Sequence, residues 1–151
     1  MADKIFSVEQ AEDSSGFLLW QVTTLWQRGI KKALEPLGIT HPQFVLLASL
    51  MWLSGQKETV TQIDLSHHSK IDPMTTSTVL RTLQTKGLVE RKEHATDTRA
   101  KTVQLTKAGT QTVKQGIKTV EHFDREFFAL LGPKQKDFNK HLLSISNAYP
   151  Q

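Results

Sequence analysis

Residues 70–105 read KIDPMTTSTVLRTLQTKGLVERKEHATDTRAKTVQL, and the class of fold can be inferred from this segment. Asp72 and Pro73 predict the start of a helix, because an Asp side chain caps free backbone N–H groups and Pro fits the first helical position. Gly87 predicts the end of that helix, because glycine readily adopts the left-handed conformation that closes many helices. The segment between these residues is therefore expected to be a single helix.

This expected helix has two different faces. At 100° per residue, Thr76, Val79, Leu80 and Leu83 share one side and are expected to pack inward. The other side carries hydroxyl groups, a thioether and a guanidinium but no carboxylate, on Met74, Thr75, Ser77, Thr78, Arg81, Thr82 and Thr85. Such groups suit close approach to DNA, where they meet phosphate oxygens or base edges, and threonine methyls can touch thymine methyls. The pattern indicates a DNA-contacting helix; the alternative is a solvent-exposed helix that is merely rich in threonine.

A shorter helix precedes this one. Thr61 predicts its cap, Asp64 lies in its first turn, and it is expected to end near Ser69. A short helix, a turn of a few residues and a second helix with an exposed polar face form a helix-turn-helix. In such a unit the second helix, here residues 73–86, enters the major groove.

Two short strands follow the helix-turn-helix. Residues 88–93 and 101–105 have strand character, and the second segment alternates apolar and polar side chains. The polar residues 94–99 lie between them, so the two strands are expected to form a hairpin that serves as a wing. Arg99 and Lys101 are then placed to reach a minor groove, where narrow A·T segments attract Arg.

Further helices flank this winged module. A capping box at Thr40 and Gln43 predicts a helix to about Gly55 that is apolar nearly all round and should be the central core helix. Longer helical patterns cover residues 14–37 and, with a Gly-Pro break, residues 106–148. Their apolar stripes exceed what the small module can cover, so we expect a homodimer.

The expected fold class is mainly α: a winged helix-turn-helix with a small β-hairpin wing and long N- and C-terminal dimerisation helices. Residues 1–13 are expected to be a flexible arm, and residues 14–151 a single domain. Within that domain, residues 14–37 and 106–148 would dimerise, and residues 40–105 would form the DNA-binding module.

Charge and composition point in the same direction. The net charge is +4, and the segment 66–107 holds eight Lys or Arg against four acids, which leaves eleven of each elsewhere. Starting this window at Thr61 adds Asp64 and reduces the excess to +3. The excess therefore lies in the segment predicted to meet DNA.

Several other classes of protein find no support in the sequence. It has no Cys, no apolar run of membrane-spanning length and no signal-peptide layout, so a cytoplasmic location without a membrane partner is expected. No Gly-x-Ser-x-Gly, phosphate-binding glycine loop or HExxH motif indicates an enzyme, and no cofactor is expected.

Four fragments stand in fixed order along the chain: Asp72-Pro73-Met74-Thr75, Leu83-x-x-Lys86-Gly87-Leu88-Val89-x-Arg91, Asp97-x-Arg99 and Leu105-Thr106-x-x-Gly109. Together with the order of elements, they resemble the MarR (multiple-antibiotic-resistance regulator) family of winged-helix transcription factors over about residues 15–145. The resemblance implies a dimer made by the terminal helices, a recognition helix in the major groove, wings in flanking minor grooves and, often, release by a small ligand. By position, Asp97 would orient the wing tip and Arg99 would enter the minor groove.

The chain is thus expected to be a sequence-specific DNA-binding regulator, most simply a homodimeric repressor of a pseudo-palindromic operator. The expected DNA-contacting residues are Met74, Thr75, Ser77, Thr78, Arg81, Thr82, Asp97, Arg99 and Lys101. Whether each hydroxyl meets a base or a phosphate stays open at this point. A winged helix used for protein contact is an alternative, although the carboxylate-free helix face argues against it.

Two further groups of residues could bind ligands. A small aromatic or amphipathic effector could bind among the aromatic side chains of Phe17, Trp20, Trp26, Phe44 and Trp52, which could equally be core. His67 and His68 with Asp64 suggest a metal-responsive regulator, but adjacent His side chains point about 100° apart and no second ligand cluster lies near. His122 and Glu126 are expected to be a surface pair.

Overall fold

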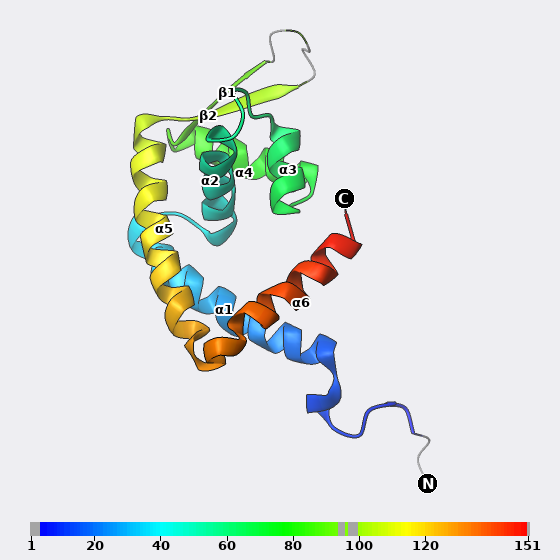
Figure 1. Cartoon of the computed structure of the whole chain (residues 1–151). Helices are drawn as coiled ribbons and strands as arrows, with labels where there is room; N and C mark the ends of the chain where they lie inside the picture. Colours follow the sequence, from blue (N-terminus) through cyan, green and yellow to red (C-terminus); the bar gives the residue numbers. More distant parts are fainter. Residues whose placement is uncertain (1–3, 94–95, 97–99, 151) are drawn as a thin grey trace.

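The structure is a computed structural model that describes residues 4–93, 96 and 100–150. In chain order, its elements are η1 (Ala11–Asp13), α1 (Ser15–Leu34), η2 (Glu35–Leu37), α2 (His41–Ser54), α3 (Gln62–Ser69), α4 (Pro73–Thr85), β1 (Val89–Glu93), β2 (Lys101–Leu105), α5 (Lys107–Phe127), η3 (Ala129–Lys134) and α6 (Gln135–Ala148). Figure 1 shows α2, α3, α4 and the hairpin at one end of the molecule, with α1, α6 and the far end of α5 at the other. The mainly helical winged fold expected from the sequence is confirmed.

The predicted helix starts are confirmed by capping bonds. The side chains of Thr40 and Thr61 accept from backbone N–H groups at the third helical positions of α2 and α3, each within a complete capping box. Thr106 caps α5 in the same way by accepting from the backbone N–H of Gly109. These bonds satisfy N–H groups that have no partner within a helix.

The ends of α4 are also as predicted. The Asp72 carboxylate accepts from the backbone N–H of Thr75 at 2.8 Å. At the other end Gly87 has φ of 75°, and the N–H of Leu88 donates to the carbonyl of Leu83 at 3.0 Å. This is the Schellman arrangement, in which a left-handed glycine closes the helix and turns the chain into the wing.

The core is built around α2, as its apolar sequence predicts. Leu46, Leu47 and Leu50 of α2 are fully buried, and other buried apolar side chains come from the elements that pack around α2. These side chains include Ile30, Leu34, Leu65, Leu80, Leu83, Val89, Val103 and Val113. One core therefore joins α1 and α5 to the winged module.

The hairpin pairs β1 and β2 antiparallel, with Val89 opposite Leu105 and Glu93 opposite Lys101. The connector before α3, which the sequence predicts to be extended over residues 57–60, lies beside β2: the N–H of Val103 donates to the carbonyl of Val60 at 2.8 Å. This pairing was not predicted. This bond ties the base of the wing to the start of the helix-turn-helix.

The C-terminal helix returns to the helix-turn-helix. Lys70, in the turn between α3 and α4, donates from Nζ to the carbonyls of Ser146 and Tyr149 at 3.0 and 3.2 Å. Lys70 has a positive φ of 62°, a conformation that is unusual for a residue with a side chain. In Figure 1 the C-terminal end of α6 points toward α3, in agreement with this contact.

No single helix among the described residues is long and apolar enough to cross a membrane, although α1 with η2 and α2 meet the length and composition test as a pair bent by 76°.

Candidate nucleic-acid interface

Helix α4, the helix that the sequence predicts to enter the major groove, presents its polar side to solvent and its apolar side to the core. Met74 is 81% exposed, and Thr75, Thr78, Arg81 and Thr82 are exposed as well. Ser77 is half-buried. The prediction that Thr76 packs inward is confirmed, because it is fully buried and its hydroxyl donates to the carbonyl of Ile71.

Most hydroxyl groups on this face already have partners. Thr75 donates to the Asp72 carboxylate at 2.6 Å. Thr78, Thr82 and Thr85 each donate to the carbonyl four residues earlier in α4, at 3.1, 3.3 and 3.1 Å. The bonds from Thr75 lower the pKa of the Asp72 carboxyl, so the cap stays ionised.

Arg91 joins β1, α4 and α3, and it is not among the site residues that the sequence predicts. It projects from β1 and donates from Nε to Gln84 Oε1 of α4 at 2.8 Å and from Nη1 to Gln62 Oε1 of α3 at 2.7 Å. Burial, and then the positive charge of Arg81, lower the pKa of the Arg91 guanidinium. The guanidinium groups of Arg81 on α4 and Arg91 on β1 thus lie near each other, and two neighbouring positive charges attract phosphate. The alternation of side chains along β1 could have indicated that Arg91 points toward the helices, since Arg91 lies on the same face of the strand as the buried Val89.

Lys86 holds the other end of α4. Its Nζ donates to the carbonyl of Gly38 at 2.8 Å and to Oε1 of Gln43 at 3.0 Å. Gln43 is the buried residue whose side chain also completes the capping box of α2. The orientation of the recognition helix is therefore fixed against the start of the core helix.

The wing supplies one described residue of the predicted site. Lys101 is exposed at the first position of β2. Asp97 and Arg99, also expected to contact DNA, lie outside the described residues. Their predicted roles therefore rest on the sequence alone.

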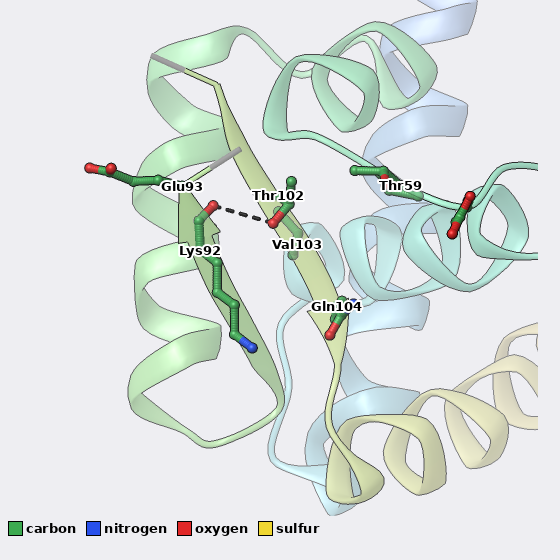
Figure 2. A pocket seen from close by; sticks show the side chains of 8 residues that line it. Thr59, Lys92, Glu93, Thr102, Val103 and Gln104 are labelled. Carbon is green, nitrogen blue, oxygen red and sulfur yellow. Dashed lines mark hydrogen bonds between the residues drawn. The ribbon is translucent and has the colours of Figure 1, made fainter. Parts of the chain in front are cut away.

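A hollow of about 220 Å³ lies beside the hairpin. Figure 2 shows the side chains that line it, which come from both strands and from the connector before α3. Across the hairpin, the hydroxyl of Thr102 donates to the carbonyl of Lys92 at 3.3 Å. The charged residues of the lining are Glu58, Glu93 and Lys92. Because Lys92 and Glu93 are consecutive residues of β1, their side chains point to opposite faces of the hairpin, so these charges do not form one surface.

The five aromatic residues considered for a ligand pocket do not share one cavity. Phe44 is buried in the core, whereas Trp20 is 69% and Trp52 63% exposed. Phe17 and Trp20 line a shallow hollow on α1. Trp26 lies at the junction of α1, α2 and α5, where its Nε1 donates to Asp124 at 2.8 Å. The helical period predicts that these side chains lie on helices, but it does not predict which helices pack against each other.

A different apolar cavity lies where α1 meets the far end of α5, η3 and α6. It has a volume of about 500 Å³ and is lined by Val22, Leu25, Phe127, Phe128, Leu130, Leu131 and Phe138. Only its α1 wall lies near the residues expected from the sequence.

The histidine pairs differ in their surroundings. Asp64, the carboxylate considered with His67 and His68, instead binds Lys57 Nζ at 2.8 Å and the N–H of Thr61 at 2.9 Å. His122 and Glu126 form the predicted exposed surface pair, at 3.4 Å. Among the described residues no group of three or more His, Asp or Glu could hold a metal ion.

Comparisons with known proteins agree with this architecture. An ArnR1-like winged-helix domain matches residues 35–122. The chain is 43% identical over 122 residues to the HTH-type transcriptional regulator YdcH of Bacillus subtilis, covering 81% of this chain and 83% of that protein. It is 31% identical over 133 residues to the HTH-type transcriptional repressor Rv2887 of Mycobacterium tuberculosis, covering 87% of this chain and 93% of that protein.

Solved structures show the same similarity. A mutant MarR from E. coli complexed with operator DNA has a TM-score of 0.75 and 26% identity, with 87% of this chain and 91% of that chain covered. Rv2887 in complex with p-aminosalicylic acid has a TM-score of 0.65 and 29% identity, with 88% and 98% covered. The chain belongs to the MarR family of winged helix-turn-helix transcriptional regulators, and it is a DNA-binding regulator.

Proposed function

We propose that this chain is a homodimeric repressor that binds a pseudo-palindromic operator with half-sites about one helical turn apart. The observation that carries the proposal is the exposed face of α4. Within Pro73–Thr85 it offers hydroxyls and a guanidinium without any carboxylate, beside the cation of Arg91. Residues 40–105 would form the DNA-reading module, with Met74, Thr75, Ser77, Thr78, Arg81 and Thr82 in the major groove and Lys101, Asp97 and Arg99 in the wing.

The dimer is supported by apolar side chains that the single chain leaves exposed. They lie on α1 and α6, namely Phe17, Leu18, Leu19, Trp20, Val22, Leu25, Leu142, Leu143 and Ile145. Exposed apolar surface on this scale typically marks an interface. Residues 14–37 and 106–148 would hold two recognition helices at fixed spacing, and residues 1–13 would remain an arm outside the domain.

One relative supports the proposal of a repressor that binds a small molecule. Rv2887 is named a repressor, and its solved complex contains p-aminosalicylic acid. We propose that a small aromatic or amphipathic effector binds this chain and weakens its binding to DNA. The apolar cavity lined by Val22, Phe127 and Phe138 offers such a ligand burial of its ring. The place of action would be the cytoplasm, where bacterial operator DNA lies.

Selection of binding sites from random duplex DNA with the purified full-length chain tests the proposal. We expect an inverted repeat whose half-sites lie about 10 base pairs apart, because a two-fold dimer presents its two recognition helices one turn apart. Recovery of a single, non-repeated site would contradict the dimer, and recovery of unenriched DNA would contradict sequence-specific binding.

A further inference from the structure

The orientation of two threonines on α4 limits what they can offer to DNA. Thr78 and Thr82 are exposed and lie one turn apart on the outer side of the helix. The hydroxyl of Thr78 donates to the carbonyl of Met74 at 3.1 Å, and that of Thr82 donates to the carbonyl of Thr78 at 3.3 Å. Each hydroxyl proton is therefore already used within the helix.

A threonine bound in this way is poorly suited to a phosphate. Phosphate oxygens only accept hydrogen bonds, so a contact with them would require the hydroxyl to leave its backbone carbonyl. What remains available are the γ-methyl group and the acceptor lone pairs of the hydroxyl, and of these the methyl is the apolar group. In the major groove the matching apolar group is the C5-methyl of thymine.

We propose that Thr78 and Thr82 read thymine methyl groups in the major groove, with their γ-methyls as the contacting atoms. This inference rests on the proposed function and goes beyond it by assigning the two residues to bases rather than to phosphates. It also names the base. Because the two side chains lie one turn apart on the same helix, both thymines belong to the same half-site.

The test uses the full-length chain and the duplex recovered by selection from random DNA. Each thymine of one half-site is replaced in turn by uracil, which lacks only the C5-methyl. We expect an affinity loss of about fourfold at the contacted positions, the factor that corresponds to burial of one methyl group. Uracil at other positions is expected to change affinity less than twofold.

Two variants at each residue separate the methyl from the hydroxyl. Thr78→Ser lacks the methyl, so it should bind the thymine duplex about fourfold more weakly and be indifferent to uracil at its position. Thr78→Val keeps the methyl and should stay as sensitive to uracil as the wild type. The same pair of outcomes is expected for Thr82→Ser and Thr82→Val at a different thymine.

Thr110 is a matched control. It makes the same kind of bond, from its hydroxyl to the carbonyl of Thr106 at 3.0 Å, but lies on α5. Thr110→Ser and Thr110→Val should leave uracil sensitivity unchanged. A motif recovered by selection whose affinity is indifferent to every uracil would overturn this inference while leaving the proposed function intact. Loss of binding in Thr78→Val but not in Thr78→Ser would overturn it too, because it would assign the contact to the hydroxyl.

Discussion

At the scale of single residues, His41 lies at the point where three helices meet. It is the first residue of α2, and its ring contacts Trp26 of α1 edge to face, with centroids 5.0 Å apart. Trp26 in turn donates to Asp124 of α5. Burial lowers the pKa of His41 below its ordinary value of 6.5, and the charge of Asp124 opposes this shift only in part. The folded protein therefore favours the neutral imidazole.

This shift predicts that acid weakens the fold. Because the pKa of His41 is lower in the folded chain than in the unfolded chain, the unfolded chain takes up a proton first as the pH falls below 6.5. The free energy of unfolding should therefore decrease as the pH falls from about 6.5 to the lower pKa that His41 has in the folded chain. Urea unfolding at several pH values would measure this.

The variant His41→Gln should flatten that pH dependence, although loss of the ring contact with Trp26 should cost about 1 kcal/mol at neutral pH. His141→Gln, on the exposed surface of α6, serves as the control. An unchanged pH dependence in His41→Gln would exclude His41 as its source.

At the scale of elements, the wing and α5 are joined by a close backbone approach. A Cβ atom added to Gly109, in the first turn of α5, would lie 1.9 Å from the carbonyl oxygen of Leu88, just before β1. Because the obstacle is backbone, no side-chain rotation can relieve the contact. The sequence shows a glycine near a helix start but not this reason for it.

Gly109→Ala is therefore expected to destabilise the chain by about 2 kcal/mol, since overpacking outweighs the roughly 1 kcal/mol that alanine gains in helix propensity. Gly16→Ala is the matched control, because a Cβ there meets nothing within 4 Å. That variant should be neutral or slightly stabilising. Chemical denaturation of both variants would measure the difference, and equal stabilities would contradict the backbone clash.

At the scale of the whole molecule, the proposed dimer predicts a mass twice the 17.1 kDa of the chain. Leu143 of α6 is 59% exposed in the single chain. Leu143→Glu should weaken dimerisation by about 2 kcal/mol or more, because it removes apolar burial and places a charge in the interface. Sedimentation velocity would measure the dimer, and DNA affinity should fall with it.

Trp52→Gln is the control for this change, because Trp52 is similarly exposed but lies on α2 of the winged module. It should leave the sedimentation coefficient unchanged. A wild-type chain that sediments as a monomer at micromolar concentration would contradict the dimer itself.

The elements and their order can be predicted from the sequence, because interactions between residues close in the chain set them. Asp72, Thr40, Thr61 and Thr106 act through hydrogen bonds to residues three positions away, and Gly87 acts through its own φ. The inward phase of Thr76 follows from the helical period alone.

Contacts between side chains of different elements depend on tertiary packing and could not be predicted from the sequence. Arg91 reaches Gln62 and Gln84 from another segment of the chain, and Lys86 reaches Gly38. Phe44 is buried in the core whereas Trp20 is exposed, although both lie in apolar helical patterns. These outcomes depend on how helices pack against one another, and neither the helical period nor the caps encode that packing.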